Sequence, residues 1–271
     1  MRVYRGDRGL ALSDALRDLW AGRELLAAWT VREVRVRYKQ SVLGAAWAIL
    51  QPLSMMVVFS IIFTRFISVP TGEISYPLFS YVALLPWTFF SGAITSGTVS
   101  VVNQMALVSK IQFPREILPL AQIGAAGFDF CVASAMFVAM AFLYRVSPGW
   151  TLLAVPGLLL IQILFAAGLV LMLSALTVRC RDTRFVVPLA MQLWMYATPV
   201  IYPLDLVPTR WQWLYRLNPM AVLIEGYRDA VINLRMPASA DVALAALVSL
   251  GVLVAGYVYF KRTEMSVADV L

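Results

Sequence analysis

Long stretches without one charged side chain run through this chain of 271 residues. Residues 74–109 and 146–178 contain no Asp, Glu, Lys or Arg, and further uncharged runs cover 40–64 and 185–204. About 20 consecutive apolar residues suffice for a helix through a bilayer core about 30 Å thick. Because backbone groups in lipid need partners within the protein, such runs favour membrane helices. The sequence therefore predicts an all-α integral membrane protein.

Composition agrees with this fold class. The chain is 61% hydrophobic and 14% charged, whereas soluble domains are nearer half apolar and a quarter charged. The net charge of +7 is modest. We interpret the basic residues as a signal of how the protein is oriented in the membrane. The expected partners are membrane lipids, and no nucleic acid is expected. With no histidine and two cysteines, a metal site is not expected, because zinc sites use three or four such ligands.

Six membrane spans are predicted, at about 42–64, 77–101, 119–144, 150–178, 185–203 and 242–260. They form one transmembrane domain over 40–262, between an N-terminal segment 1–39 and a tail 263–271. An even number of spans puts both termini on one side of the membrane. That side then carries 16 of the 22 Lys and Arg residues, so the positive-inside rule predicts that both termini are cytoplasmic.

The N-terminal segment is polar and basic. Leucines recur at roughly helical spacing from Leu12 to Leu26, and Ser13 is a candidate N-cap. This pattern predicts an amphipathic helix lying in the membrane interface, with Gly22 as a point at which it breaks.

The stretch from Asn103 to Leu120 interrupts the apolar runs with three charges, Lys110, Arg115 and Glu116. Pro114 cannot donate a backbone hydrogen bond, so a turn is expected near it. Two interpretations stay open. The stretch is either a short connector on the membrane surface or a short helix on which another protein pushes.

The segment 205–241 is too polar to span a membrane and too aromatic for an ordinary loop. Trp211, Trp213 and Tyr215 stand close together, and Pro219 then begins a second helical pattern. Irregular backbone at membrane depth needs cover from protein or water. Two short helices that dip into the outer leaflet fit this segment, and so does an external hairpin at the interface.

Three stretches together resemble a known family. They are VRYKQSVLGAAWAILQPL (36–53), SKIQFPREILPL (109–120) and NPMAVLIEGYRDAVI (218–232). They resemble the type-2 ABC-transporter permeases, in particular the exporters of O-antigen, capsule and teichoic-acid polysaccharides. The resemblance implies a homodimeric channel in the bacterial inner membrane, without catalysis of its own, that moves a lipid-linked polysaccharide out of the cytoplasm.

The resemblance also implies a separate ATPase dimer that binds ATP and Mg. In keeping with this, the sequence contains no GxxxxGK[ST] phosphate-binding loop. By resemblance, the 103–116 loop couples the permease to that ATPase, and 218–234 forms short gate helices on the outer side. The matching coupling residues are Phe113, Pro114, Arg115 and Glu116, with Lys110 beside them. The matching gate residues are Asn218, Pro219, Glu225, Tyr227 and Arg228. Glu225 and Arg228 are three residues apart on a helix and can pair.

Asp129 is the one ionisable group predicted deep inside a span. Intramembrane carboxylates are costly and are treated as functional by default. We expect no basic partner and no second carboxylate within the membrane. We therefore favour a structural hydrogen bond to a neighbouring helix, near Gly124 and Gly127, over a proton relay.

Several aromatic side chains are candidates to line a sugar path, because aromatic faces stack on pyranose rings. Aromatics in membrane helices more often pack or anchor the helix at the interface, so we expect only some of them to face a channel. The candidates are Trp47, Trp87, Phe89, Phe90, Trp194 and Tyr196.

Other function classes need features that the sequence lacks. A membrane glycosyl- or acyltransferase needs a general base or a bound metal, hence clustered carboxylates or histidine; here the carboxylates are scattered. A proton-coupled carrier needs several intramembrane ionisable groups. A type-2 exporter of another substrate, such as a drug or a lipid, is the nearest alternative.

Overall fold

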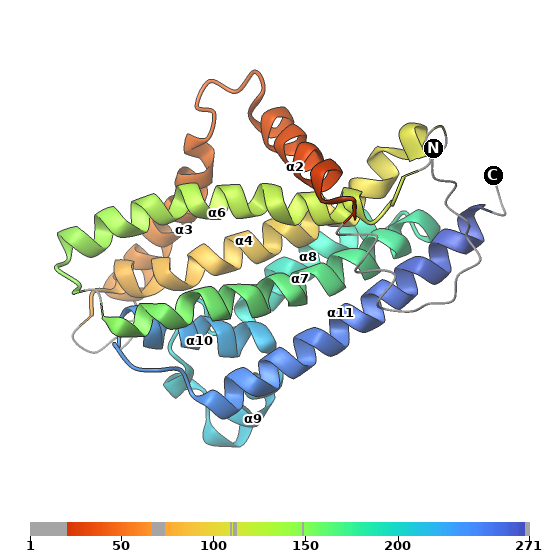
Figure 1. The fold of residues 1–271 in the computed structure, drawn as a ribbon. Helices are drawn as coiled ribbons and strands as arrows, with labels where there is room; N and C mark the ends of the chain where they lie inside the picture. The colour runs from red at the N-terminus through yellow and green to blue at the C-terminus, as the bar shows by residue number, and fades with distance from the viewer. Residues whose placement is uncertain (1–20, 67–73, 109, 111–112, 148, 269–271) are drawn as a thin grey trace.

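A computed structural model describes residues 21–66, 74–108, 110, 113–147 and 149–268 of the chain. Within these ranges the regular structure is helical throughout. Four long helices, α6, α4, α7 and α11, run side by side, as Figure 1 shows. The fold is thus all-α, as predicted.

Five helical stretches are long and apolar enough to cross a membrane. The first joins α3 (Ala46–Ile61) to a π-helical turn (Ile62–Phe66). The second and third are α4 (Tyr76–Asn103) and α6 (Ile117–Leu143). A 3₁₀ turn (Trp150–Leu153) leads into α7 (Ala154–Arg179), and the last is α11 (Ser239–Ala268). At about 1.5 Å per residue, each reaches about 30 Å or more.

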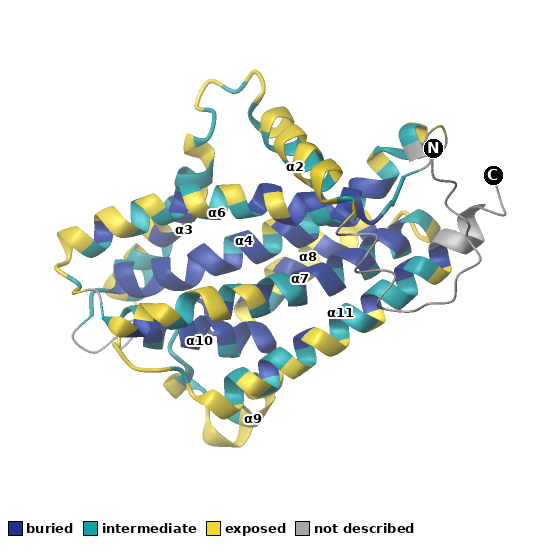
Figure 2. Ribbon diagram, in the orientation of Figure 1, coloured by how far each residue is buried: buried dark blue, intermediate teal, exposed yellow. Residues whose placement is uncertain are grey.

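Helix α4 forms the centre of the bundle. It packs against α6, α7, α3, α8 and α10, and most of its side chains from Tyr76 to Val101 are buried. Pro77 lies in its first turn, where the missing N–H costs no helical hydrogen bond, and Pro86 lies inside the helix. Figure 2 shows the resulting buried interior along α4 and α10, with exposed positions on the outer helices.

Helices α7 and α11 approach each other so closely that their backbones touch. A Cβ placed on Gly256 would lie 2.0 Å from the backbone oxygen of Gly168. Small residues permit such close contact between membrane helices. The pair therefore fixes how α11 packs on the bundle.

The predicted fifth span, 185–203, contains a shorter helix. Helix α8 covers Thr183–Tyr196, 14 residues or about 21 Å, and non-helical backbone follows it to Pro203. The described residues thus hold five helices of spanning length. A sixth crossing would have to combine α8 with the segment after it.

Two short helices connect α8 to α11. After a 3₁₀ turn (Leu204–Leu206), α9 covers Thr209–Leu217 and α10 covers Pro219–Val231. Helix α10 buries nine of its residues and packs on α4, α7 and α11. Helix α9 buries none. Helix α10 is therefore packed into the bundle, whereas α9 lies at its surface.

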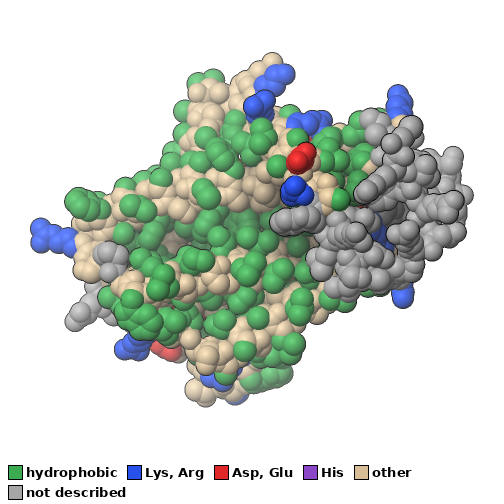
Figure 3. Space-filling model, viewed as in Figure 1, with side chains coloured by type: hydrophobic (Ala, Val, Ile, Leu, Met, Phe, Trp, Pro, Cys, Tyr) green, Lys and Arg blue, Asp and Glu red, His purple; other side chains and the backbone are tan. Residues whose placement is uncertain are grey.

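Helix α2 (Arg23–Tyr38) lies outside the bundle and packs on α6, as Figure 1 shows. It begins directly after Gly22, while the pattern from Leu12 to Leu19 lies outside the described residues. Its exposed apolar side chains, Leu25, Val31 and Val36, do not form one stripe. In the space-filling view, hydrophobic side chains cover the middle of the visible face and most of the charged ones lie at its margins (Figure 3).

Candidate functional site

The loop before α6 separates the predicted coupling residues into two groups. Lys110 is exposed, and Phe113, Pro114 and Arg115 are partly exposed. Glu116 is buried, with 1% of its side chain accessible. A partner protein can therefore reach the first four residues, whereas Glu116 points into the fold.

Glu116 is the N-cap residue of α6 and forms an ion pair with Lys261 of α11, whose Nζ lies 2.9 Å from its carboxylate. A carboxylate is favourable at a helix N-terminus, where the backbone N–H groups carry partial positive charge. The pair joins the start of α6 to the end of α11, and these two ends lie at the same side of the bundle (Figure 1).

The short helix predicted for the coupling loop remains a prediction. Helix α5 (Met105–Val108) is a four-residue helix just after α4, and residues 109, 111 and 112 lie outside the described part. Phe113 stacks on Trp29 of α2, with ring centroids 6.2 Å apart. The loop therefore contacts α2 as well as α11.

Asp129 has the basic partner that we did not expect. Arg37, near the end of α2, forms an ion pair with it, and the Tyr38 hydroxyl donates a hydrogen bond to the same carboxylate. Burial, followed by the Asp129 hydrogen bond, raises the pKa of Tyr38. The basic partner comes from α2, outside the membrane spans, so no basic residue within the spans pairs with Asp129 in the described residues.

Further polar contacts hold α2 on α6. The Gln122 side chain donates to Glu33 at 2.8 Å, and Thr30 packs where a Cβ on Gly124 would lie 2.7 Å from its methyl carbon. A cavity of about 250 Å³ lies between α2, α4 and α6, lined partly by Glu33, Gln122 and Asn103. The side of α2 that faces the bundle thus carries polar residues, such as Glu33, beside the apolar Trp29.

In the predicted gate segment, Asn218 and Tyr227 hold α10 to its neighbours. The Asn218 side chain caps α10 by accepting from the Met220 N–H at 3.1 Å, and it donates to Thr198 at 3.0 Å. The Tyr227 hydroxyl donates to Gln162 of α7 at 3.0 Å. Gln162 in turn donates to the backbone oxygen of Pro86, inside α4, at 2.7 Å.

Arg228 lies at the centre of this segment, with 2% of its side chain exposed. It pairs with Glu225 at 2.7 Å, as the three-residue spacing predicted. It also donates to the backbone oxygens of Pro199 at 2.6 Å and Val200 at 2.7 Å. Its guanidinium carbon lies 3.8 Å from the centre of the Phe79 ring in α4.

Arg228 therefore joins α10, the segment after α8 and the start of α4. A planar guanidinium can serve several acceptors at once, and buried backbone oxygens need such partners. Glu225 is only one of these partners, and 27% of its side chain is exposed. Pro219 begins α10 and is buried.

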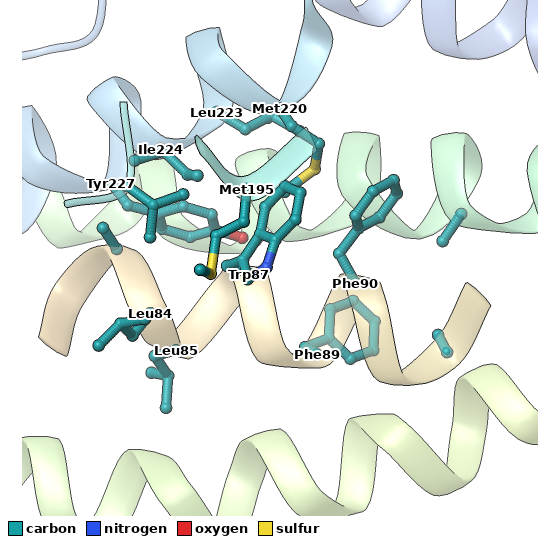
Figure 4. Close-up of a cluster of buried hydrophobic side chains, with 14 of the residues drawn as sticks. Leu84, Leu85, Trp87, Phe89, Phe90, Met195, Met220, Leu223, Ile224 and Tyr227 are labelled. Carbon is teal, nitrogen blue, oxygen red and sulfur yellow. The ribbon is translucent and has the colours of Figure 1, made fainter. Parts of the chain in front are cut away.

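Most of the candidate channel-lining aromatics lie in the interior of the protomer. Trp87, Phe89 and Phe90 are at most 3% exposed, and Figure 4 shows them beside Met195 and Met220. Trp194 is partly buried and meets the Trp87 and Phe90 rings edge-on. This placement favours packing for these four. The two with about half of their surface exposed are Trp47 and Tyr196.

No group of three or more His, Cys, Asp or Glu residues that could hold a metal ion occurs in the described part of the chain. Two of its ion pairs, Arg37–Asp129 and Lys261–Glu116, join different helices. The arrangement offers two functional regions: an accessible loop at one end of the bundle and a firmly held helix, α10, toward the other. Sequence reasoning missed Arg37, Lys261 and Gln162, because each of them contacts a residue far away in the sequence.

The sequence model of the ABC-2 type transporters matches residues 24–232. The chain is 30% identical to the O-antigen export system permease protein RfbA of Myxococcus xanthus, over 94% of this chain and 98% of that protein. It is 30% identical to a Klebsiella pneumoniae protein of the same name, over 78% and 81% of the two chains. It is 23% identical to the polysialic acid transport protein KpsM of Escherichia coli, over 86% and 91%.

Proposed function

Because the chain belongs to the ABC-2 type transporter family, we propose that it is the membrane permease of an ATP-driven polysaccharide exporter. The observation that carries this proposal is the similarity to an O-antigen export permease along nearly the whole length of both chains. A second relative, named for polysialic acid transport, supports a glycan as the class of substrate. Two copies form the channel, and the polymer is linked to a lipid carrier.

Energy enters from a separate ATPase dimer, which binds ATP and Mg. The accessible residues Lys110, Phe113, Pro114 and Arg115 form its docking surface. Force on this loop can pass along two contacts, from Phe113 to Trp29 of α2 and from Glu116 to Lys261 of α11. The positive-inside rule supports a cytoplasmic position for the loop and both termini, in the inner membrane of a bacterium.

The polymer leaves beside α9 and α10. Three observations support a re-entrant arrangement. Helix α8 is short, Asn218 at the start of α10 binds Thr198 just after α8, and Tyr227 binds a residue of spanning helix α7. Irregular backbone from Thr198 to Ile201, just after α8, is tolerated at this depth because protein covers it. We interpret α10 as the part of the gate that stays in place and α9 as the part that moves.

Deletion of the gene tests this function in the bacterium that carries it. Loss of a permease should abolish polysaccharide at the cell surface, while lipid-linked polymer accumulates inside. Loss of a glycosyltransferase would leave no polymer anywhere. Unchanged surface and internal polysaccharide would contradict the proposal and favour a drug or lipid as the substrate.

A further inference from the structure

An aromatic cleft opens between α9 and the segment after α8. Its volume is about 380 Å³, within the range of small-ligand sites. Its walls come from α9 and from the turn that precedes it. We call it the α9 cleft, and it is lined by Tyr202, Leu206, Val207, Pro208, Trp211, Leu214 and Tyr215.

Two tyrosine hydroxyls give the α9 cleft a polar feature. The hydroxyl oxygens of Tyr202 and Tyr215 are 3.0 Å apart, and Tyr202 also donates to the backbone oxygen of Tyr196 at 3.0 Å. Tyr202 has one proton, so Tyr215 donates to Tyr202. The Tyr215 oxygen keeps acceptor capacity for a hydroxyl of a ligand.

Trp211 supplies an aromatic surface, with 49% of the residue exposed. The guanidinium of Arg210 lies 5.8 Å from the centre of its ring. An exposed aromatic face and nearby hydroxyl acceptors suit a pyranose, which presents C–H groups on one face and hydroxyls at its edge. An acyl chain would use the aromatic surface but not the hydroxyl pair.

We propose that the α9 cleft binds one or two sugar units of the exported chain as it leaves the permease. This inference rests on the proposed function and names a contact that the polymer makes on the way out. Helix α9 joins α10 at Asn218, and α10 is tied to α4 and α7, so the cleft lies beside the part of the gate that is held in place. Weak binding suits a site through which successive sugars must pass.

The competing occupant is lipid, because exposed tryptophans commonly anchor helices at the membrane interface. The chain offers a matched control for it. Trp213 lies on the same helix, two residues from Trp211, and is 58% exposed, but it does not line the cleft. Anchoring would use both tryptophans, whereas a sugar site would use Trp211 alone.

The test uses the full chain in nanodiscs. The probe is the polysaccharide displayed by the parental cells, cut to oligosaccharides by mild acid, and binding is followed by saturation-transfer NMR. Trp211→Ala should weaken binding about tenfold or more, as for a central aromatic contact. Tyr215→Phe should also weaken it, and Trp213→Ala should leave it unchanged.

Equal effects of Trp211→Ala and Trp213→Ala, or no binding to the wild-type protein, would overturn the proposal. Equal loss of fluorescence quenching by brominated phospholipids in the two variants would assign the cleft to lipid instead. If gene deletion abolishes surface polysaccharide but the purified protein binds no sugar at the cleft, only the sugar-binding role of the α9 cleft is rejected. The proposed function would then stand.

Discussion

The Lys261 ammonium lies 2.9 Å from the buried Glu116 carboxylate and joins the end of α11 to the start of α6. The contact bridges 145 positions of sequence, next to the loop that we assign to the ATPase. We predict that Glu116→Lys and Lys261→Glu each lower the stability of the permease, because an uncompensated buried charge costs about 3–5 kcal/mol. Thermal unfolding in detergent measures this.

The double variant that exchanges the two charges is the control. It should recover most of the lost stability, since the pair is then rebuilt in reverse. Failure of the exchange to restore any stability would show that the ion pair is not what holds these ends together.

Coupling should depend on the accessible side of the same loop. We predict that Lys110→Glu with Arg115→Glu reduces export strongly while the permease still inserts into the membrane. Export and ATP hydrolysis are compared with those of Arg145→Glu, an exposed charge in the turn after α6. Normal export by the double variant would remove the loop from the mechanism.

Arg228 should matter far more than its partner Glu225. Arg228→Ala leaves the oxygens of Pro199 and Val200 without their donor, at about 1–3 kcal/mol for each buried group. Glu225→Ala removes one of several acceptors. We therefore expect a large loss of thermal stability and an ion leak from Arg228→Ala, and smaller effects from Glu225→Ala.

Arg228→Lys distinguishes the geometry of the guanidinium from its charge. An ammonium on a flexible stem does not match two fixed backbone oxygens as well, so this variant should fall between wild type and Arg228→Ala. Equal damage from Glu225→Ala and Arg228→Ala, with rescue in the double variant, would restore a simple two-residue gate pair.

The contact between α7 and α11 predicts a steric effect at one glycine. Gly256→Ala would place a Cβ 2.0 Å from the oxygen of Gly168, and the backbones would have to separate at about 1–3 kcal/mol. Gly251→Ala, in the same helix with nothing within 4 Å, should be neutral. Melting temperatures of the two variants check this, and equal values would contradict the close contact.

The ion pair between Arg37 and Asp129 predicts that α2 is held on α6 by charge. Asp129→Asn should weaken the contacts of Arg37 and Tyr38 and let α2 open locally more often. Backbone hydrogen exchange over 23–38 should rise severalfold, while exchange in α4 stays unchanged. Unaltered exchange in α2 would assign its position to the Trp29 and Glu33 contacts instead.

The sequence was sufficient for features that depend on local pattern. Uncharged runs predicted the long helices, and spacing on one helix predicted the Glu225–Arg228 pair. Residues 205–241 were correctly separated from the spans, because their charges exclude a lipid-exposed helix.

Contacts between distant residues were not predictable in the same way. Arg37 lies 92 positions from Asp129, and no local pattern relates them. In the sequence Glu116 resembles a surface charge, but in the fold it is buried and pairs with Lys261 of α11. Likewise, nothing in the sequence shows whether Trp87 and Phe90 line a channel or pack in the interior. Those choices follow from how the helices are arranged in space.

ATP-driven movement of polymer by the reconstituted complex measures the proposed function most directly. The permease and its ATPase are placed in inside-out vesicles with labelled lipid-linked polysaccharide outside. Polymer should become protected from an added glycosidase only with both subunits and hydrolysable ATP, and not with the Lys110→Glu, Arg115→Glu permease. Protection of the polymer without ATP hydrolysis would contradict the assignment as a polysaccharide export permease. So would a lack of protection in vesicles in which the permease does stimulate the ATPase.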